Sequence, residues 1–424
     1  MWRFAPARTL IYNVTTNVNR SGIGEDKNMK HNPGLRLLIS WCLFSGLLTV
    51  AALAQSGHPL DARPGALPSS AELHRWFEFS KDVARGLCEG DPRFGLELKN
   101  SGQENSAYAK VLFEGEVVGA FLSENSSTSV AGEISTFEIG RALGCGGLFQ
   151  PAVNMELRGT GLATFRRLLE AGVFVGAKEL NRQQVLDEIA SDPAVLHGVF
   201  KQWLPMKPVA YRSIELPDFP PNGALNESDP IARFLKRSAP QARTEMIDLP
   251  GVGGSAPACE LARQLSDILL VDAMAGEWDR FSGANLHAYV ESGRARLVAL
   301  DNGGASFKND QGYLDKFKSW VTRFDPEVAA NLFELEKFCD RPGEHEFRGF
   351  RDEASLARAL NIDGADAWDV FKQRVRKVAA HVREAEKAGG AFFPIPRERG
   401  TPQTKSVRRN LASGPHGSPP VSSL

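Results

Sequence analysis

Residues 279–307 read DRFSGANLHAYVESGRARLVALDNGGASF, and structural signals follow one another more closely here than elsewhere in the chain. A polar loop of small residues comes first, at 279–285. Two β-rich runs follow, Leu286–Val290 and Ala295–Leu300, and the Glu-Ser-Gly between them is typical of a hairpin turn. Asp301 comes after the second run, directly ahead of Asn-Gly-Gly. The segment therefore predicts a loop, a hairpin and an acidic residue at the end of a strand.

The residues before this segment predict a long amphipathic helix, Cys259–Met274 (CELARQLSDILLVDAM). Asp279 then lies in the loop after a helix, Asn285 ends that loop, and Asp301 follows the hairpin. Phosphoryl transfer to a hydroxyl needs an acidic group near the nucleophile and oxygen ligands for the cation that binds the phosphates. We interpret these three residues as a candidate site for that chemistry. The alternative is a simple series of turns, because Asp, Asn and Gly all favour turns.

DRFSGAN followed by VALDNGGASF resembles the catalytic core of atypical kinases that have a DR…N…D-N-G pattern. These include the secretory-pathway kinases of the Four-jointed and Golgi casein kinase group, the HipA-type kinases and, more distantly, the phosphatidylinositol kinases. The resemblance covers about residues 258–307, and a looser match extends to GEISTFEIGRALG at 132–144. It implies an α+β, bilobal protein-kinase-like fold, with a small strand-rich amino lobe (71–206) and a mainly helical carboxy lobe (207–388).

The resemblance also implies roles for the three residues. Asp279 would be the catalytic acid/base, and Asn285 and Asp301 would be the ligands of Mg²⁺ or Mn²⁺ that accompanies ATP. Five residues separate Asp279 from Asn285, whereas the familiar kinase loop has four. The acceptor would be a hydroxyl on a protein or a glycan, and the enzyme class a phosphotransferase.

Two nucleotide-binding residues are expected from the resemblance in the amino lobe. Glu133 would be the helix carboxylate that orients a nucleotide-contacting lysine; alternatively, it is a first-turn carboxylate favoured by the helix dipole. The family places that lysine on the preceding strand, about residues 119–122, where this chain has none. Lys110, on the other strand of the hairpin, is our candidate, although it also fits an exposed strand lysine. The missing lysine motivates an alternative function, a catalytically inactive pseudokinase that acts as a nucleotide-binding or scaffold protein.

Outside these motifs, hydrophobic periodicity predicts a hairpin at 108–122 and several helices. Gly144 is the expected C-cap of the helix that ends at Leu143. Residues 198–211 are predicted to be a strand-like connector. The helices are expected at 71–87, 132–143, 162–171, 182–191, 313–323, 326–338 and 365–387.

The amino terminus predicts export. Residues 37–54 carry no charge and end in Ala-Leu-Ala, which matches a signal-peptide cleavage site. We expect the chain to start at Met29, with residues 1–28 a misassigned start and 29–54 a signal peptide; the alternative is an uncleaved membrane anchor. A linker at 55–70 and a disordered tail at 389–424 are expected from their Gly, Pro and Ser content.

Composition excludes several classes of protein. The chain has 424 residues with 50 Lys+Arg and 51 Asp+Glu, a formal net charge of −1, so we expect no nucleic-acid partner. A membrane partner is expected only if the amino-terminal segment stays attached. The exported chain would keep four cysteines, at 88, 145, 259 and 339, enough for two disulfides. We predict that they remain unpaired.

Overall fold

The computed structural model describes residues 70–98, 108–126, 128–203, 211–212, 230–236, 245–249, 254–281, 285–291, 294–308, 312–389 and 392–393. The predictions for residues 1–69, and for the tail after residue 393, lie outside these ranges. The predicted lobe boundary near residue 206 also lies outside them. In the described ranges, no helix has both the length and the apolar character needed to cross a membrane.

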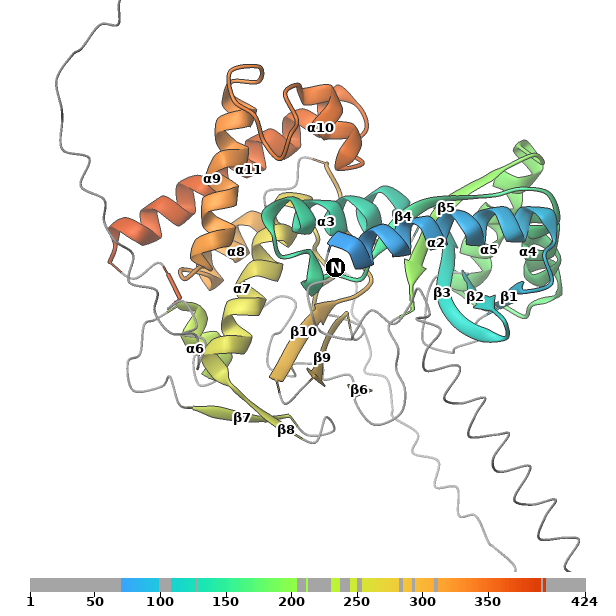
Figure 1. Cartoon of the computed structure of the whole chain (residues 1–424), viewed down its shortest axis with the longest axis horizontal. Coiled ribbons are helices and arrows are strands. Elements are labelled where there is room, and N and C mark those ends of the chain that lie inside the picture. Colours follow the sequence, from blue (N-terminus) through green and yellow to red (C-terminus); the bar gives the residue numbers. More distant parts are fainter. Residues whose placement is uncertain are drawn as a thin grey trace, which may run out of the picture. The chain divides into compact units, whose positions relative to one another are not determined.

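The amino-terminal part, residues 70–203, is built on a five-stranded antiparallel sheet with the strand order β1-β2-β3-β5-β4 (Figure 1). The strands are β1 (Phe94–Leu98), β2 (Tyr108–Phe113), β3 (Glu116–Ser123), β4 (Ala152–Leu157) and β5 (Leu196–Gln202). The helices are α2 (Ser70–Glu89), α3 (Val130–Leu143), α4 (Gly159–Ala171) and α5 (Ala177–Ser191), with the short 3₁₀ helix η1 (Gly146–Leu148). The predicted hairpin and the four predicted helices of this part are therefore confirmed.

Strand β5 confirms the strand character predicted for residues 198–202, but it corrects the expectation that this stretch is only a connector. It lies in the interior of the sheet, hydrogen-bonded to β3 on one side and to β4 on the other. Both faces of the sheet pack against other elements, so every residue of β5 from Gly198 to Gln202 is buried rather than every second one. Leu196, Val199 and Phe200 have no exposed surface. Strands β1 and β4 were not predicted from the sequence, and neither was the pairing of β5 with β3 and β4.

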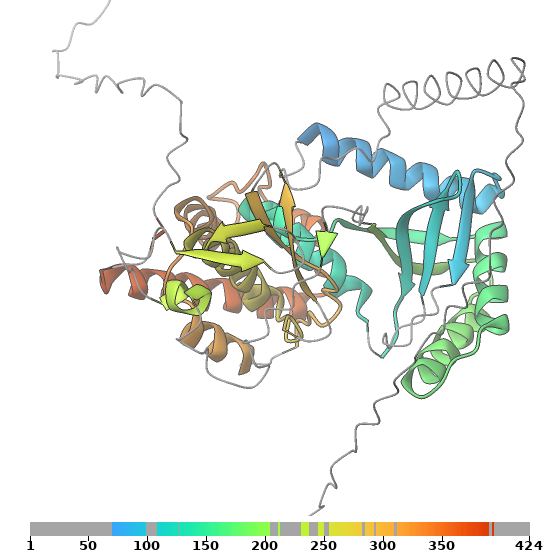
Figure 2. The same ribbon diagram turned by 90° about the horizontal axis from the view of Figure 1, so that it is seen from below.

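The two faces of the sheet pack against different helices because side chains alternate along each strand. On one face, Phe121 and Phe200 join a hydrophobic cluster with residues of α2, α4 and α5. Figure 2 shows α2, in blue, running across the sheet on this face. On the other face, Leu122 and Val199 join a larger cluster that includes residues of α3 and of the carboxy-terminal part. Helix α3 therefore packs between the sheet and the rest of the fold.

The carboxy-terminal part, residues 211–393, is mainly helical. Its helices are α6 (Pro230–Lys236), α7 (Ala258–Ala275), α8 (Gly312–Trp320), α9 (Pro326–Asp340), α10 (Glu353–Ala359) and α11 (Ala365–Lys387). Its strands are β6 (Tyr211–Arg212), β7 (Met246–Leu249), β8 (Gly254–Pro257), β9 (Leu286–Glu291) and β10 (Arg294–Ala299). The predicted α+β class, with a first part built on one antiparallel sheet and a mainly helical second part, is confirmed. Helix α8 ends three residues earlier than predicted, and α10 was not predicted.

Helix α7 is the central element of this part. Every residue from Gln264 to Ala275 is buried, so the helix is covered on all sides rather than on one stripe. It ends at Gly276, whose φ of 76° is a left-handed conformation that glycine adopts without steric cost. The chain then enters the loop that contains Asp279, and the predicted β9–β10 hairpin follows it.

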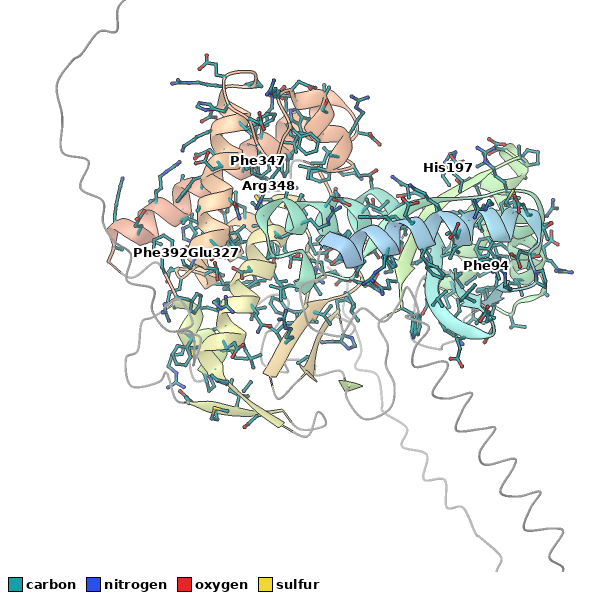
Figure 3. The ribbon with its side chains drawn as sticks, in the orientation of Figure 1. Phe94, His197, Glu327, Phe347, Arg348 and Phe392 are labelled. Carbon is teal, nitrogen blue, oxygen red and sulfur yellow. The ribbon has the colours of Figure 1, made fainter. Side chains whose placement is uncertain are left out.

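Helix α3 is fixed at both ends. At its start, Ser129 Oγ accepts a hydrogen bond from the backbone N–H of Gly132 at 3.1 Å. At its end, Gly144 has a φ of 86° and forms the predicted C-cap. Two side chains from the carboxy-terminal part bind the last carbonyls: Asn331 Nδ2 donates to Leu143 and Arg348 Nε, labelled in Figure 3, donates to Ala142. The helix therefore has little freedom to move relative to α9 and the loop after it.

The four cysteines of the described residues carry no disulfide. Cys145 and Cys339 are buried, and Cys88 and Cys259 are partly buried. Burial raises the pKa of Cys339 to about 12, which keeps this thiol protonated and unreactive at neutral pH.

Replacing Trp76 tests the packing of α2 on the sheet. Its side chain is 3% exposed and stacks on Phe200 with 6.0 Å between ring centroids. Trp76→Ala is expected to lower the free energy of unfolding by about 3–5 kcal/mol, because it leaves a cavity in the cluster. Trp278, 65% exposed, is the matched control, and Trp278→Ala is expected to change stability by less than about 0.5 kcal/mol. Urea denaturation of both variants checks this; equal losses would contradict the packing.

Candidate active site

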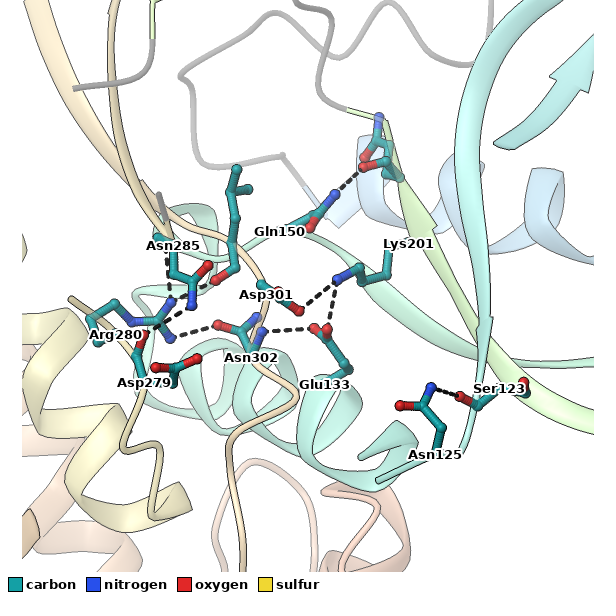
Figure 4. A network of polar contacts seen from close by, with 12 residues as sticks. Ser123, Asn125, Glu133, Gln150, Lys201, Asp279, Arg280, Asn285, Asp301 and Asn302 are labelled. Carbon is teal, nitrogen blue, oxygen red and sulfur yellow. Dashed lines mark hydrogen bonds and ion pairs between the residues drawn. The ribbon is translucent and has the colours of Figure 1, made fainter. Parts of the chain in front are cut away.

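Three segments that are distant in sequence bring charged side chains together (Figure 4). Lys201 of strand β5 donates from Nζ to Glu133 Oε1 of helix α3 at 2.6 Å. The same Nζ lies 3.6 Å from Oδ1 of Asp301, which follows strand β10. A lysine ammonium is therefore held between a carboxylate of the amino-terminal part and a carboxylate of the carboxy-terminal part.

The position of Lys201 follows from its place in β5. It lies two residues after Val199, so its side chain projects from the same face of the sheet, the face covered by α3. Its cross-strand neighbours are Ala120 of β3 and Ala152 of β4, whose small side chains leave room for the lysine stem. Only 6% of Lys201 is exposed, and an almost buried lysine needs charged partners.

Glu133 connects the lysine to the loop after β10. Its second oxygen, Oε2, accepts a hydrogen bond from the backbone N–H of Asn302 at 3.0 Å. The neighbouring Gly132 allows this approach, because a Cβ atom at that position would lie 2.6 Å from the carbonyl oxygen of Ala305. Helix α3 and the Asp301–Ala305 loop are therefore in direct contact at the residue that binds the lysine.

Burial and charge set the ionisation of this cluster. Burial raises the pKa of Glu133 to about 7, although the Lys201 charge acts in the opposite direction. Burial disfavours the Lys201 charge, but the Glu133 and Asp301 carboxylates outweigh it and raise the lysine pKa. Lys201 also lowers the pKa of Asp301, whose side chain is 59% exposed. Asp301 is therefore an ionised carboxylate that solvent, or a ligand, can reach.

Asp301 has an unusual backbone conformation. Its φ is 49°, in the left-handed region that Asp tolerates better than most side chains. Such positions cost free energy and concentrate at functional sites. The turn also allows Asn302, the next residue, to be fully buried while Asp301 stays exposed.

A second set of contacts is organised by Arg280, whose guanidinium is buried. Two of its nitrogens donate to both carboxylate oxygens of Asp272 on α7, each at 2.9 Å. Other N–H groups donate to the carbonyls of Asn285 and Leu300 and to Asn302 Oδ1. Burial opposes the charge, but the Asp272 carboxylate raises the pKa of Arg280, so the guanidinium stays charged. Arg280 thus joins α7, the loop after it, the hairpin and the residue after Asp301.

Asp279 and Asn285 lie on the two sides of this loop. Asn285 Nδ2 donates to the carbonyl oxygen of Asp279 at 2.9 Å. The backbone N–H of Leu300 donates to the Asn285 carbonyl at 2.8 Å, which attaches the end of the loop to the end of β10. The backbone N–H of Asp279 donates to Glu277 Oε1 at 2.7 Å. The Asp279 side chain is half-buried, and its main chain is held at both the N–H and the carbonyl.

The structure brings together four of the five residues singled out from the sequence. Glu133 and Asp301 share Lys201, and Asp279 and Asn285 contact each other and reach Asn302 through Arg280. Lys110, the candidate lysine, is elsewhere: its Nζ lies 3.0 Å from Glu97 Oε1 across the β1–β2 pair.

Sequence reasoning missed Lys201 because the search followed chain order. The lysine was expected just before α3, but it comes 68 residues after Glu133. It is carried by β5, which pairs with β3 and therefore lies next to the expected strand in space. A usable signal was present, since Lys201 directly follows Val199 and Phe200 in LHGVFKQW, and a lysine buried among such residues requires a partner.

The oxygen donors of the site fit a divalent cation with a nucleotide. Mg²⁺ is typically held by one or two protein carboxylate or amide oxygens together with substrate phosphates and water. Asp301 offers an exposed, ionised carboxylate. The hydrogen bond of Asn285 to Asp279 uses the amide nitrogen, so its amide oxygen is the atom suited to a cation. No group of three or more His, Cys, Asp or Glu side chains arranged to hold a metal occurs among the described residues.

No family model matches the chain, and no curated protein sequence matches it. Among solved structures, it is similar to the Golgi casein kinase with Mn and ADP bound, at 14% identity and a TM-score of 0.48, over 74% of this chain and 78% of that one. It is also similar to hydra Fam20 with sugar, at 15% identity and a TM-score of 0.47, over 79% of this chain and 95% of that one. The first of these belongs to the kinase group that residues 258–307 resemble.

Removing the Arg280 guanidinium tests its bracing role. Arg280→Met is expected to lower the free energy of unfolding by about 3–5 kcal/mol, because Asp272 would remain buried without its partner. Arg351, whose ion pair with Glu346 is largely exposed, is the control: Arg351→Met should leave the denaturation midpoint unchanged. Urea denaturation measures both. An Arg280→Met protein as stable as the wild type would contradict the role.

Proposed function

We propose that this chain is an exported atypical kinase that transfers the γ-phosphoryl group of ATP to a hydroxyl on a protein or glycan. The observation that carries the proposal is the contact of Lys201 with both Glu133 and Asp301. A cation of the protein beside an exposed carboxylate can bind a phosphate chain and its metal ion at the same place. The resemblance of residues 258–307 to atypical kinases independently supports this chemistry.

Lys201 is proposed to bind the phosphate oxygens of ATP. A lysine ammonium acts as a point charge toward phosphate, and its usefulness depends on being held in place. Glu133 supplies that restraint through its 2.6 Å contact, and its own second oxygen is held by the Asn302 N–H. Glu133 would therefore act through the lysine, and Lys201 takes the role for which Lys110 was the candidate.

Asp279 is proposed to accept the proton of the acceptor hydroxyl. As the hydroxyl oxygen bonds to the γ-phosphorus, the bond to the bridging oxygen of ADP breaks and the hydroxyl proton passes to the Asp279 carboxylate. The hydrogen bond from Asn285 Nδ2 to the Asp279 carbonyl would hold the main chain of Asp279 during this step.

Asp301 and Asn285 are proposed as the protein ligands of Mg²⁺ or Mn²⁺. When bound, the cation would offset the negative charge of the phosphate oxygens. Lys201 keeps Asp301 ionised, because it lowers the pKa of that carboxyl. Arg280 would fix the positions of these two ligands relative to each other, since it donates to the Asn285 carbonyl and to the side chain of Asn302, the residue after Asp301.

The inactive-pseudokinase alternative rested on the missing lysine. Lys201 removes that motive, because it pairs with the helix carboxylate in the manner expected of the nucleotide lysine. The alternative still predicts a distinct result, namely nucleotide binding without phosphoryl transfer. The proposal of export rests on residues 29–54.

A radiolabelled ATP assay on the purified protein tests the proposed function. With Mg²⁺ or Mn²⁺, and with casein and the protein itself as acceptors, we expect label transfer. Asp279→Asn is expected to lower kcat at least about 100-fold while nucleotide binding persists, because the acid/base is lost. Asp301→Asn is expected to weaken both metal-dependent binding and transfer. Nucleotide binding without transfer by the wild type would favour the pseudokinase, and no binding at all would contradict both functions.

The two lysines give a direct comparison. Lys201→Met is expected to lower kcat/KM for ATP about 100-fold, because the phosphate-binding charge is removed. Lys110→Met, which removes a lysine on a strand of the same sheet, is expected to leave kcat/KM within about 2-fold of the wild type. Steady-state kinetics over a range of ATP concentrations distinguishes the variants. The reverse ranking would return the nucleotide-binding role to Lys110.

A further inference from the structure

Glu277 is a buried carboxylate that the proposed roles do not use. It lies between the end of helix α7 and Asp279, and its side chain has no exposed surface. Its Oε1 accepts the backbone N–H of Asp279 at 2.7 Å. Its Oε2 has no hydrogen-bond partner within the described part of the chain. A carboxylate with a single hydrogen bond is an expensive group to bury.

Arg280 does not donate a hydrogen bond to the Glu277 carboxylate. A guanidinium has five N–H donors. Those of Arg280 are directed to the two oxygens of Asp272, the carbonyls of Asn285 and Leu300, and the side chain of Asn302. This buried cation is thus committed to other acceptors. Burial raises the pKa of Glu277 to about 8, although the Arg280 charge acts in the opposite direction.

Glu277 also touches the loop that carries Asp301. A Cβ atom added to Gly304 would clash with Glu277 Oε1 and would lie 3.2 Å from Asp279 Cβ. Glycine at this position therefore allows the loop after β10 to approach Glu277 and Asp279 together. The Glu277 carboxylate therefore contacts the backbone of Asp279, the proposed acid/base. It also lies against Gly304, three residues after the proposed metal ligand Asp301.

We infer that Glu277 is a positioning residue that holds the backbone of Asp279 against the Asp301–Gly304 loop, so that the Asp279 carboxylate is presented at a constant position to the acceptor. This inference rests on the proposed phosphoryl transfer. Among the described residues, the Glu277 side chain hydrogen-bonds only the Asp279 backbone N–H, and it makes no hydrogen bond to Lys201, Asn285 or Asp301. Its loss is therefore expected to reduce turnover rather than nucleotide affinity.

Two variants separate the loss of the hydrogen-bond acceptor from the loss of the carboxyl group. Glu277→Gln keeps a side-chain oxygen that can accept the Asp279 N–H, whereas Glu277→Leu fills a similar volume without an acceptor. Glu336, buried and paired with Arg383 between α9 and α11, supplies the matched control, Glu336→Leu. It removes a buried carboxylate that has no contact with the site.

Kinetics gives the first measurement. Glu277→Leu is expected to lower kcat about 100-fold, with the dissociation constant for ADP and Mn²⁺ changed less than about 3-fold, because misplacement of a catalytic group affects the transition state alone. Glu277→Gln is expected to restore kcat to within about 10-fold of the wild type. Glu336→Leu is expected to lower the melting temperature and leave kcat of the folded protein unchanged.

Hydrogen exchange gives a second measurement that does not depend on activity. The Asp279 amide is expected to exchange at least about 10-fold faster in Glu277→Leu than in the wild type, and to stay protected in Glu277→Gln. Wild-type kcat in Glu277→Leu, or an Asp279 amide that stays protected in it, would overturn the inference. So would a parallel loss of kcat and nucleotide binding in Glu277→Leu and Glu277→Gln, since that would show a merely structural role. A wild type without transfer would overturn the proposed function, while the exchange comparison would still decide whether Glu277 holds Asp279.

Discussion

The buried guanidinium of Arg280 is the interaction on which the arrangement of the carboxy-terminal part depends. Its charge is balanced by Asp272, and its remaining N–H groups bind the ends of the loop and of the hairpin. A buried arginine is stable only when its donors are satisfied, so these segments can occupy only positions that meet its planar geometry. The loop conformation that presents Asp279 is a consequence of this requirement, and Glu277 adds a separate restraint on the same residue.

A second buried ionic contact joins this arrangement to the sheet. Lys201 and Glu133 belong to the amino-terminal part, while Asp301 and Asn302 belong to the loop after β10. A lysine that is almost buried must find carboxylates, and a buried glutamate must find donors. Because each satisfies the other, the sheet, helix α3 and the loop meet at one point. That point is also where a nucleotide phosphate and its cation would have complementary charges.

Residues close together in sequence were predicted well. The order of helix, loop and hairpin around Asp279 and Asp301 was correct, because hydrophobic periodicity and turn residues report local structure. Glu133 was correctly placed on a helix that begins near Ser129 and ends at Gly144. The lysine partner was not found, since strand β5 reaches the sheet only after two helices and a further strand intervene.

By itself, the sequence predicted most of the helices, the two hairpins, the resemblance to atypical kinases and the candidate residues Asp279, Asn285 and Asp301, because each is encoded within a few tens of neighbouring residues. Only the tertiary structure decided which lysine meets Glu133. Strand pairing is a long-range choice, and the register of β5 between β3 and β4 places Lys201, rather than Lys110, on the face covered by α3. Spacing along the chain carries no information about which distant strands become neighbours, whereas the burial of charged groups forces their pairing once the chain has folded.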